Sequence, residues 1–131
     1  MYLLDTDTLV YLLKGNEAVK DNLKANLYTP MSTSAINLIE LYFGAFKSRH
    51  VAANLAKVRT IEKELEILPI GQEMTETFGS LKADLEKQGN RLDDFDLAIA
   101  SCAMAHNLTL VTNNIKHFSR IDGLKLTNWT T

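Results

Sequence analysis

The chain has 131 residues, of which 46% are hydrophobic, so it is long enough to form one domain with a single buried core. A formal net charge of -2 argues against a generally basic nucleic-acid-binding protein, although a local basic cluster could still contact phosphates. Its one cysteine, Cys102, excludes an internal disulfide and indicates a reducing compartment. With no leader and no apolar run long enough to cross a bilayer, we expect a cytoplasmic protein.

Apolar runs alternate with amphipathic segments along the whole chain, without an internal repeat or a linker rich in proline and glycine. We expect strands at 1–4, 28–33, 67–70, 108–112 and 124–128. We expect helices at 7–14, 16–26, 34–47, 50–66, 72–88 and 94–106, and a turn or short helix at 114–119. This alternation predicts one α/β domain over residues 1–131, with a short central parallel sheet flanked by helices.

The first strand ends on two carboxylates, Asp5 and Asp7, in the segment LLDTDT. Open α/β sheets bind ligands at the carboxyl ends of their strands, so both acids are candidates for a functional site. A second interpretation is that Asp5 or Thr6 caps the helix that follows. A third is the D-x-D-x-T-L signature of the haloacid dehalogenase superfamily, in which the first Asp is a phosphoryl-accepting nucleophile.

The helix expected at 34–47 carries its polar residues in one narrow stripe, which consists of Asn37, Glu40, Gly44 and Lys47. Glu40 lies in the middle of this stripe. A solvated face explains a glutamate equally well. The rest of the helix is apolar, however, so we expect it to be covered, and a metal-lined cleft is one place where Glu40 can point.

Three carboxylates, Asp93, Asp94 and Asp96, stand at the start of the helix expected at 94–106. Capping of free backbone N–H groups explains one or two acids at a helix start more easily than three. We therefore assign Asp93 or Asp94 as the cap. We assign Asp96 as the functional carboxylate, because it shares a helix face with small and apolar residues.

The strand at 108–112 ends in Thr112, Asn113 and Asn114, which repeats the arrangement of the first strand. Turn formation explains an asparagine pair, but carboxamide oxygens can also hold water or a metal. The hydroxyls of Thr112 and Ser34 have two readings as well. They could orient ligands or bound water, or they could be a strand-end hydrogen bonder and a helix cap.

The order of these segments tests the dehalogenase interpretation. LVTNN resembles the second motif of that superfamily, but its members then need a lysine and a further acidic pair that holds magnesium. The segment after Asn114 contains a single acid, Asp122, and the acid-rich DDFD precedes the strand instead of following it. The order is therefore wrong for a dehalogenase.

The same segments in the same order resemble a PIN-domain ribonuclease, most closely the VapC toxins of bacterial and archaeal toxin–antitoxin pairs. The resemblance rests on LLDTD with Asp5, INLIEL with Glu40, DDFDLAIA with Asp96, LTLVTNN with Asn114 and the closing IDGLKLTNW. It covers almost the whole chain. Its most specific parts are DLAIASCAMAHNLTLVTNN and GLKLTNW.

The resemblance implies that Asp5, Glu40 and Asp96 meet at the carboxyl ends of the strands and hold Mg²⁺ or Mn²⁺. Asn114 joins this catalytic set, at a position where the family often has a fourth acid. The expected supporting residues are Asp7, Ser34, Asp94 and Thr112, where Asp7 replaces the asparagine of many relatives.

The implied reaction is hydrolysis of RNA phosphodiester bonds by a metal-activated water, which leaves a 5′-phosphate. Magnesium suits this site because it takes oxygen ligands, keeps several waters and prefers one or two carboxylates plus substrate phosphate. No Ser–His or Cys–His pairing indicates covalent catalysis. The histidines lack metal-ligand spacing and are expected in surface or loop positions: His50, His106 and His117.

The implied partners are an RNA substrate, a cognate antitoxin and a second copy of the chain in a homodimer. Candidates for holding RNA phosphates are Lys14, Lys47, Arg49, Arg91 and Lys116. An apolar groove for an antitoxin helix is expected near Leu9, Leu12, Leu41, Phe43 and Phe46. Core packing explains those five side chains equally well. The alternative function is a catalytically degraded PIN-fold binding module in a toxin–antitoxin regulatory complex.

Overall fold

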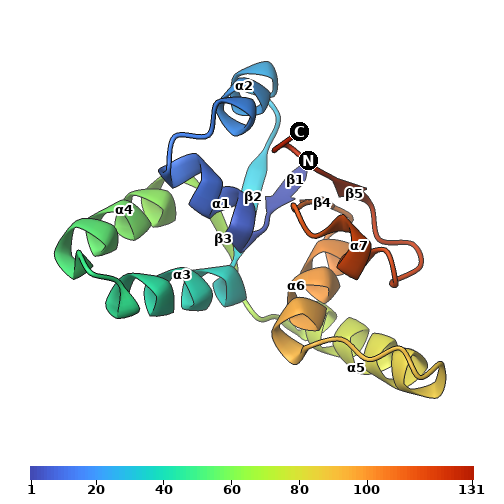
Figure 1. Ribbon diagram of the computed structural model, residues 1–131. Helices are drawn as coiled ribbons and strands as arrows, with labels where there is room; N and C mark the ends of the chain where they lie inside the picture. The colour runs from blue at the N-terminus through green and yellow to red at the C-terminus, as the bar shows by residue number, and fades with distance from the viewer.

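A computed structural model describes residues 1–131, and its strands and helices alternate as the sequence predicts (Figure 1). The strands are β1 (Tyr2–Leu4), β2 (Met31–Ser34), β3 (Glu66–Leu68), β4 (Thr109–Val111) and β5 (Leu126–Thr127). The helices are α1 (Thr6–Leu13), α2 (Glu17–Ala25), α3 (Ala35–Lys47), α4 (Val51–Glu64), α5 (Gln72–Lys87), α6 (Asp94–Ala105) and α7 (Ile115–Phe118). Every expected element is present, with boundaries that differ by a few residues. None of the helices combines the length and the hydropathy that a membrane span requires.

The five strands form one parallel sheet in the order β3-β2-β1-β4-β5. β1 lies at the centre, where Leu3 pairs with Leu110 and Leu4 pairs with Val111 of β4. The chain runs outward from β1 to β2 and β3 and then returns across β1 to β4, so the strand order reverses between β1 and β4. In open α/β sheets a crevice forms outside the carboxyl ends of the strands at this point.

Helices cover both faces of the sheet, and successive side chains of its central strands point to opposite faces. Leu3 and Leu110 belong to the cluster that α5, α6 and α7 close, while Leu4 and Val111 belong to the cluster that α1 to α4 close. All four side chains are at most 1% exposed. Full burial of one leucine contributes about 1.5–3 kcal/mol, so β1 and β4 are held firmly between the two helical layers.

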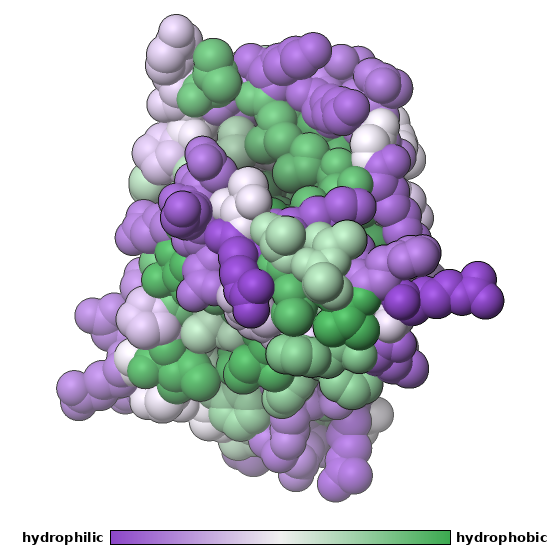
Figure 2. Space-filling view, turned by 90° about the vertical axis from the view of Figure 1, so that its left-hand side faces the viewer, coloured by the Kyte–Doolittle hydropathy of each residue, from purple (hydrophilic) through white to green (hydrophobic).

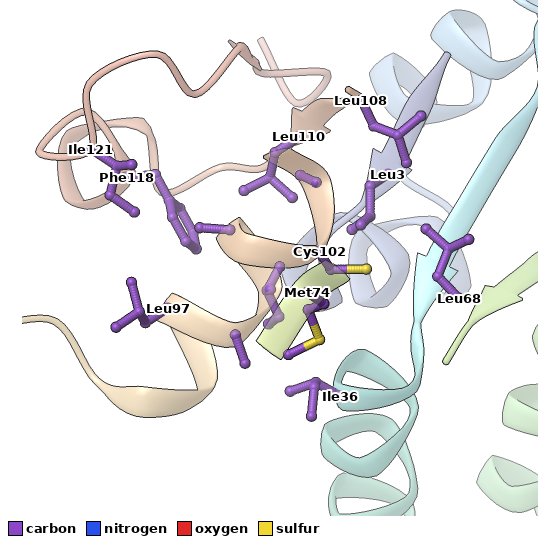
Figure 3. Close-up of a cluster of buried hydrophobic side chains, with 14 of the residues drawn as sticks. Leu3, Ile36, Leu68, Met74, Leu97, Cys102, Leu108, Leu110, Phe118 and Ile121 are labelled. Atoms are coloured by element: carbon purple, nitrogen blue, oxygen red, sulfur yellow. The ribbon is translucent and has the colours of Figure 1, made fainter. Parts of the chain in front are cut away.

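The short helix α7 is fixed by the side chains at its carboxyl end. Phe118 is 1% exposed and lies beside Ile121 in the cluster that also contains Leu97 of α6 and Met74 of α5 (Figure 3). A four-residue helix has little stability of its own, so this burial determines where α7 lies. The side chain of His117, which precedes Phe118, is thereby placed against α6.

Two residues expected in a surface groove are part of the core instead. Leu9 of α1 is 0% exposed and Leu41 of α3 is 5% exposed, because α1, α3 and α4 pack together over the sheet. Phe43 and Phe46 lie on the outer face of α3 and are 66% and 63% exposed. Leu9 and Leu41 are therefore core residues, as the core-packing alternative predicted, and neither is exposed at the surface.

A hollow does exist on this side of the molecule, between α1, α2 and α4. It has a volume of about 680 Å³, and Leu12, Leu13, Leu23 and Leu27 are among the mostly apolar residues that line it. Figure 2 shows the side where α1 to α4 lie, with hydrophobic residues gathered between polar ones. Of the five predicted groove residues, two line this hollow: Leu12, which is half-buried, and Leu9, which is buried.

Candidate active site

Asp5 follows β1 directly and occupies the N-cap of α1. Its backbone N–H donates to Val111 O at 2.9 Å, which continues the pairing of β1 with β4 beyond the strand end. Its Oδ1 accepts a hydrogen bond from the backbone N–H of Thr6 at 2.9 Å, so the side chain caps the helix as the second interpretation predicted. The cap also holds the carboxylate at the carboxyl edge of the sheet, so capping and a site role coexist.

The Asp5 carboxylate is 7% exposed and has two further donors. Asn37 Nδ2 donates to its Oδ1 at 3.1 Å, and Thr112 Oγ1 donates to its Oδ2 at 2.8 Å. Burial, followed by the negative charge of Asp7, nevertheless raises the pKa of Asp5 to about 7. The site therefore holds a carboxyl group whose ionisation is costly unless a cation compensates for its charge.

Glu40 of α3 faces the same edge of the sheet and is half-buried. Thr6 Oγ1 donates to Glu40 Oε1 at 2.5 Å, and Asn37 Nδ2 in turn donates to Thr6 Oγ1 at 2.9 Å. Asn37 thus links the Asp5 carboxylate to the Glu40 carboxylate. Burial raises the pKa of Glu40 above its usual value, and the negative charge of Asp96 adds to this effect. The hydrogen bond from Thr6 acts in the opposite direction but does not cancel it.

Asn37 itself is fully buried and is held by the start of its own helix. Its Oδ1 accepts from the Ser34 backbone N–H at 3.2 Å and from Ser34 Oγ at 2.6 Å, while its backbone N–H donates to Ser34 Oγ at 3.2 Å. This capping box confirms the interpretation of Ser34 as a helix cap. Ser34 acts on the site only through Asn37.

Asp96 lies on α6, half-buried, across the cleft from α3. His117 Nε2 lies 3.0 Å from Asp96 Oδ2 in an ion-pair geometry. Burial raises the pKa of Asp96, and the nearby His117 partly offsets this effect. His117 was expected at the surface or in a loop, but it lies half-buried in α7 beside Asp96, because the burial of Phe118 brings α7 against α6.

The other two acids at the start of α6 do not join the cleft. The Asp94 side chain is 63% exposed and forms an ion pair with Lys82 at 3.1 Å, so its predicted supporting role in the site is wrong. Asp93 occupies the N-cap position, but its side chain makes no capping hydrogen bond. Asp94 and Asp96 are two residues apart, about half a helical turn, so Asp94 faces outward while Asp96 faces the cleft.

Asp7 joins α1 to the loop after β4. Its Oδ2 accepts from the Asn113 backbone N–H at 3.1 Å and lies 3.4 Å from Thr112 Oγ1. Thr112 Oγ1 also accepts from the Asn114 backbone N–H at 3.0 Å. The structure supports both readings of Thr112, because its hydroxyl donates to a carboxylate of the site and accepts from the backbone just beyond the strand end.

These side chains line one open cleft of about 490 Å³. Its lining residues are Asp5, Thr6, Asp7, Val10, Tyr11, Lys14, Glu40, Asp96 and Asn114. The structure therefore brings together all four residues predicted as catalytic, along with Asp7. Of the five basic residues predicted to contact phosphate, only Lys14 lines this cleft.

The donor chemistry of the cleft fits a hard divalent cation, since four carboxylates and one carboxamide meet there. No three acidic, histidine or cysteine side chains anywhere in the chain are grouped closely enough to hold a metal ion by themselves. Magnesium commonly needs only one or two carboxylates and completes its shell with water and phosphate. Asp96 Oδ1 and Glu40 Oε2 accept no hydrogen bond within the chain. The assignment of Asp5, Glu40 and Asp96 as metal ligands stays a prediction.

Comparison with known proteins places this arrangement in a family. The model of the PIN domain family matches residues 2–124. The chain is a PIN domain. Among the relatives of this PIN domain, ribonuclease VapC2 of Rickettsia felis is 39% identical, and the match covers 98% of each chain. The tRNA(fMet)-specific endonuclease VapC of Salmonella typhimurium is 33% identical over 98% of this chain and 97% of the relative.

Solved structures agree with this membership. The crystal structure of VapBC2 from Rickettsia felis, bound to a DNA fragment from its promoter, contains a chain that superposes on this PIN domain with a TM-score of 0.92. The two chains are 38% identical, and the match covers 98% of each. DNA-bound VapBC from Salmonella typhimurium gives a TM-score of 0.91 at 32% identity, over 98% of this chain and 97% of that one.

Besides His117, three residues of the site were not singled out from the sequence as site residues. Thr6 was considered only as a possible helix cap, although its hydroxyl also bonds Glu40. Asn37 was visible as part of the polar stripe that contains Glu40, but its pairing with Asp5 was not. Tyr11 stands one helical turn after Asp7, a spacing that places both side chains on one face of α1.

Proposed function

We propose that this chain is the toxin of a VapBC-type toxin–antitoxin pair, a metal-dependent endoribonuclease that hydrolyses RNA phosphodiester bonds. The observation that carries the proposal is the meeting of Asp5, Glu40 and Asp96 in one cleft at the carboxyl edge of a PIN-domain sheet. Relatives that match nearly the full length of the chain are named ribonuclease or endonuclease VapC. The reducing interior of a cell, the cytoplasm, is the proposed place of action.

Asp5, Glu40 and Asp96 are the proposed ligands of Mg²⁺, with Mn²⁺ as a substitute, and Asn114 is a proposed additional oxygen donor. A bound divalent cation supplies a nucleophile by lowering the pKa of a coordinated water, and it neutralises charge on the attacked phosphate. The chain contributes by presenting oxygen atoms in fixed positions. Burial and the charges of neighbouring acids raise the pKa values of all three carboxyl groups, and a bound divalent cation would compensate for the negative charge that causes this.

The protein residues around the carboxylates hold their orientation. Asn37 and Thr112 fix the Asp5 carboxylate, Thr6 fixes one oxygen of Glu40, and His117 fixes one oxygen of Asp96. Glu40 and Asp96 are thereby restrained at one oxygen each, and Asp5 at both oxygens. Such outer hydrogen bonds commonly contribute about 10- to 100-fold to metal affinity or activity.

The proposed substrate class is transfer RNA, with the initiator tRNA as the first molecule to test, because one relative is named a tRNA(fMet)-specific endonuclease. The proposed partner is a VapB-like antitoxin, since the matching solved structures are VapBC complexes. The apolar hollow between α1, α2 and α4 offers the antitoxin a hydrophobic surface. A homodimer completes the proposed assembly.

The test is cleavage of purified initiator tRNA by the protein with Mg²⁺, with the ends of the products mapped. We expect cleavage that leaves 5′-phosphates and that EDTA abolishes. Asp5→Asn and Asp96→Asn should each lower the rate at least about 100-fold, as expected for loss of transition-state charge stabilisation. Asp94→Asn is the matched control, because Asp94 faces solvent and should leave the rate unchanged.

Cleavage that persists in Asp5→Asn, or in EDTA, contradicts the proposal and points to another site or a contaminating nuclease. A protein that binds its antitoxin but cleaves no RNA is the binding module of the alternative hypothesis. Replacement of Mg²⁺ by Mn²⁺ in the same assay decides which ion supports the faster reaction.

A further inference from the structure

One face of α1 presents an aromatic ring and a cation to the acidic cleft. Asp7, Tyr11 and Lys14 follow one another at spacings of one helical turn, and all three line the cleft. Lys14 is the C-cap residue of α1 and keeps a helical backbone, so it stays in line with the two residues before it. The helix therefore places Tyr11 between an acid of the site and a lysine.

Core packing does not account for Tyr11. Its side chain is 37% exposed and belongs to neither hydrophobic cluster, and its hydroxyl makes no hydrogen bond within the chain. Two of the other tyrosines have partners: Tyr2 packs edge-on against Trp129 with ring centroids 5.1 Å apart, and Tyr42 donates to Glu62 Oε1 at 2.5 Å. Tyr11 thus offers a free ring to whatever enters the cleft.

Lys14 is the basic residue of an otherwise acidic cleft. Four carboxylates line the cleft and repel phosphate, and Lys14 is its only basic lining residue. Lys14 makes no ion pair in the structure. It also lines an adjoining hollow of about 380 Å³ that contains Lys57, so a second cation lies farther along the same surface.

We propose that Tyr11 is a stacking platform for an unpaired RNA base beside the cleaved bond, and that Lys14 binds a flanking phosphate. An aromatic ring accepts any base by its face, so this pair selects single-stranded RNA over duplex without fixing the sequence. The inference rests on the proposed function and deepens it. In this arrangement an RNA base stacks on Tyr11 at the edge of the cleft, and the cleaved phosphate lies at the carboxylates.

The test measures binding of a short single-stranded RNA that contains 2-aminopurine, whose fluorescence falls when the base stacks on a ring. Asp96→Asn serves as the background, so that the RNA is not cleaved during the titration. We expect Tyr11→Ala to weaken binding about ten-fold and to abolish the quenching, and Tyr11→Phe to keep both. The matched control is Tyr28→Ala, because Tyr28 is 96% exposed and precedes β2, at the opposite edge of the sheet.

The contribution of Lys14 is read from the dependence of affinity on salt. Loss of one phosphate contact on a single strand reduces the slope of log affinity against log salt by about 0.7. We expect this reduction for Lys14→Gln and no change for Lys24→Gln, an exposed lysine of α2. Circular dichroism of each variant checks that the overall helix content is unchanged.

The outcomes separate this inference from the proposed function. Equal affinity and equal quenching in Tyr11→Ala and Tyr28→Ala overturn the inference, as does an unchanged salt slope in Lys14→Gln. The proposed function survives those outcomes if the wild type cleaves RNA in a reaction that requires Asp5 and Mg²⁺. A protein that neither binds nor cleaves RNA overturns both.

Discussion

Replacement of Asp5 by asparagine should stabilise the metal-free protein at alkaline pH, although it should greatly lower the rate of RNA cleavage. The pKa of Asp5 is raised from 3.8 to about 7, mainly by burial. Between these two values the folded chain keeps a proton that the unfolded chain releases. The free energy of unfolding therefore falls as pH rises through this window, and the loss is complete above about pH 7.

The size of the effect follows from the two pKa values. One pKa unit corresponds to about 1.36 kcal/mol, so ionising Asp5 within the fold costs about 4 kcal/mol. Asparagine avoids this cost and can keep the hydrogen bonds: its oxygen can accept from Thr6 and Asn37, and its NH₂ can donate to Thr112. Thr112 Oγ1 then has Asp7 Oδ2 as its own acceptor, at 3.4 Å.

The assay is urea unfolding in EDTA at about pH 5 and about pH 8, for the wild type, Asp5→Asn and the control Asp94→Asn. The wild type and the control should lose a few kcal/mol between the two pH values, and Asp5→Asn should lose much less. Added Mg²⁺ should restore stability to the wild type at the higher pH, because it binds the ionised site of the folded state. Equal stability of the wild type and Asp5→Asn at about pH 8 would refute this reasoning.

Three further changes test the supports of the site. Asn37→Ala should cost about 2–4 kcal/mol in urea unfolding, because it removes the hydrogen bonds that its buried side chain makes to Ser34 and Asp5; a loss below about 0.5 kcal/mol would contradict this. His117→Ala should raise the pKa of Asp96, since it removes a charge and a hydrogen bond that lower it; carboxyl NMR titration checks this, and an unchanged value disproves the pairing. Phe118→Ala should cost about 3–5 kcal/mol by leaving a cavity under α7, and a near-native urea midpoint would show that α7 is held by other contacts.

The order of elements and the main site residues could be predicted from the sequence. Parallel strands bring their carboxyl ends to one edge, so the acids after β1 and the asparagines after β4 had to lie near each other once β1 and β4 were neighbours. Glu40 and Asp96 could be assigned because each is polar on a helix that is otherwise largely apolar. Helical periodicity identifies such faces directly.

The residues that support the acids could not be predicted in this way. His117 meets Asp96 only because Phe118 is buried against α6, and no local pattern shows which cluster a single aromatic joins. Leu9 and Leu41 were expected to have a surface role because periodicity identifies an apolar face but not what covers it. Asp94 and Asp96 differ by two residues, and only the position of Lys82 on α5 shows which one points outward.

Direct measurement of metal binding tests the central claim, that acids far apart in the chain together hold a divalent cation. Mn²⁺ gives a strong electron paramagnetic resonance signal when free in solution, and this signal weakens when the ion is bound. Titration of the wild type and Asp94→Asn should show Mn²⁺ binding that Mg²⁺ displaces, while Asp5→Asn and Asp96→Asn should each bind the ion at least about ten-fold more weakly. Mn²⁺ affinity that is the same in all four proteins would contradict the account.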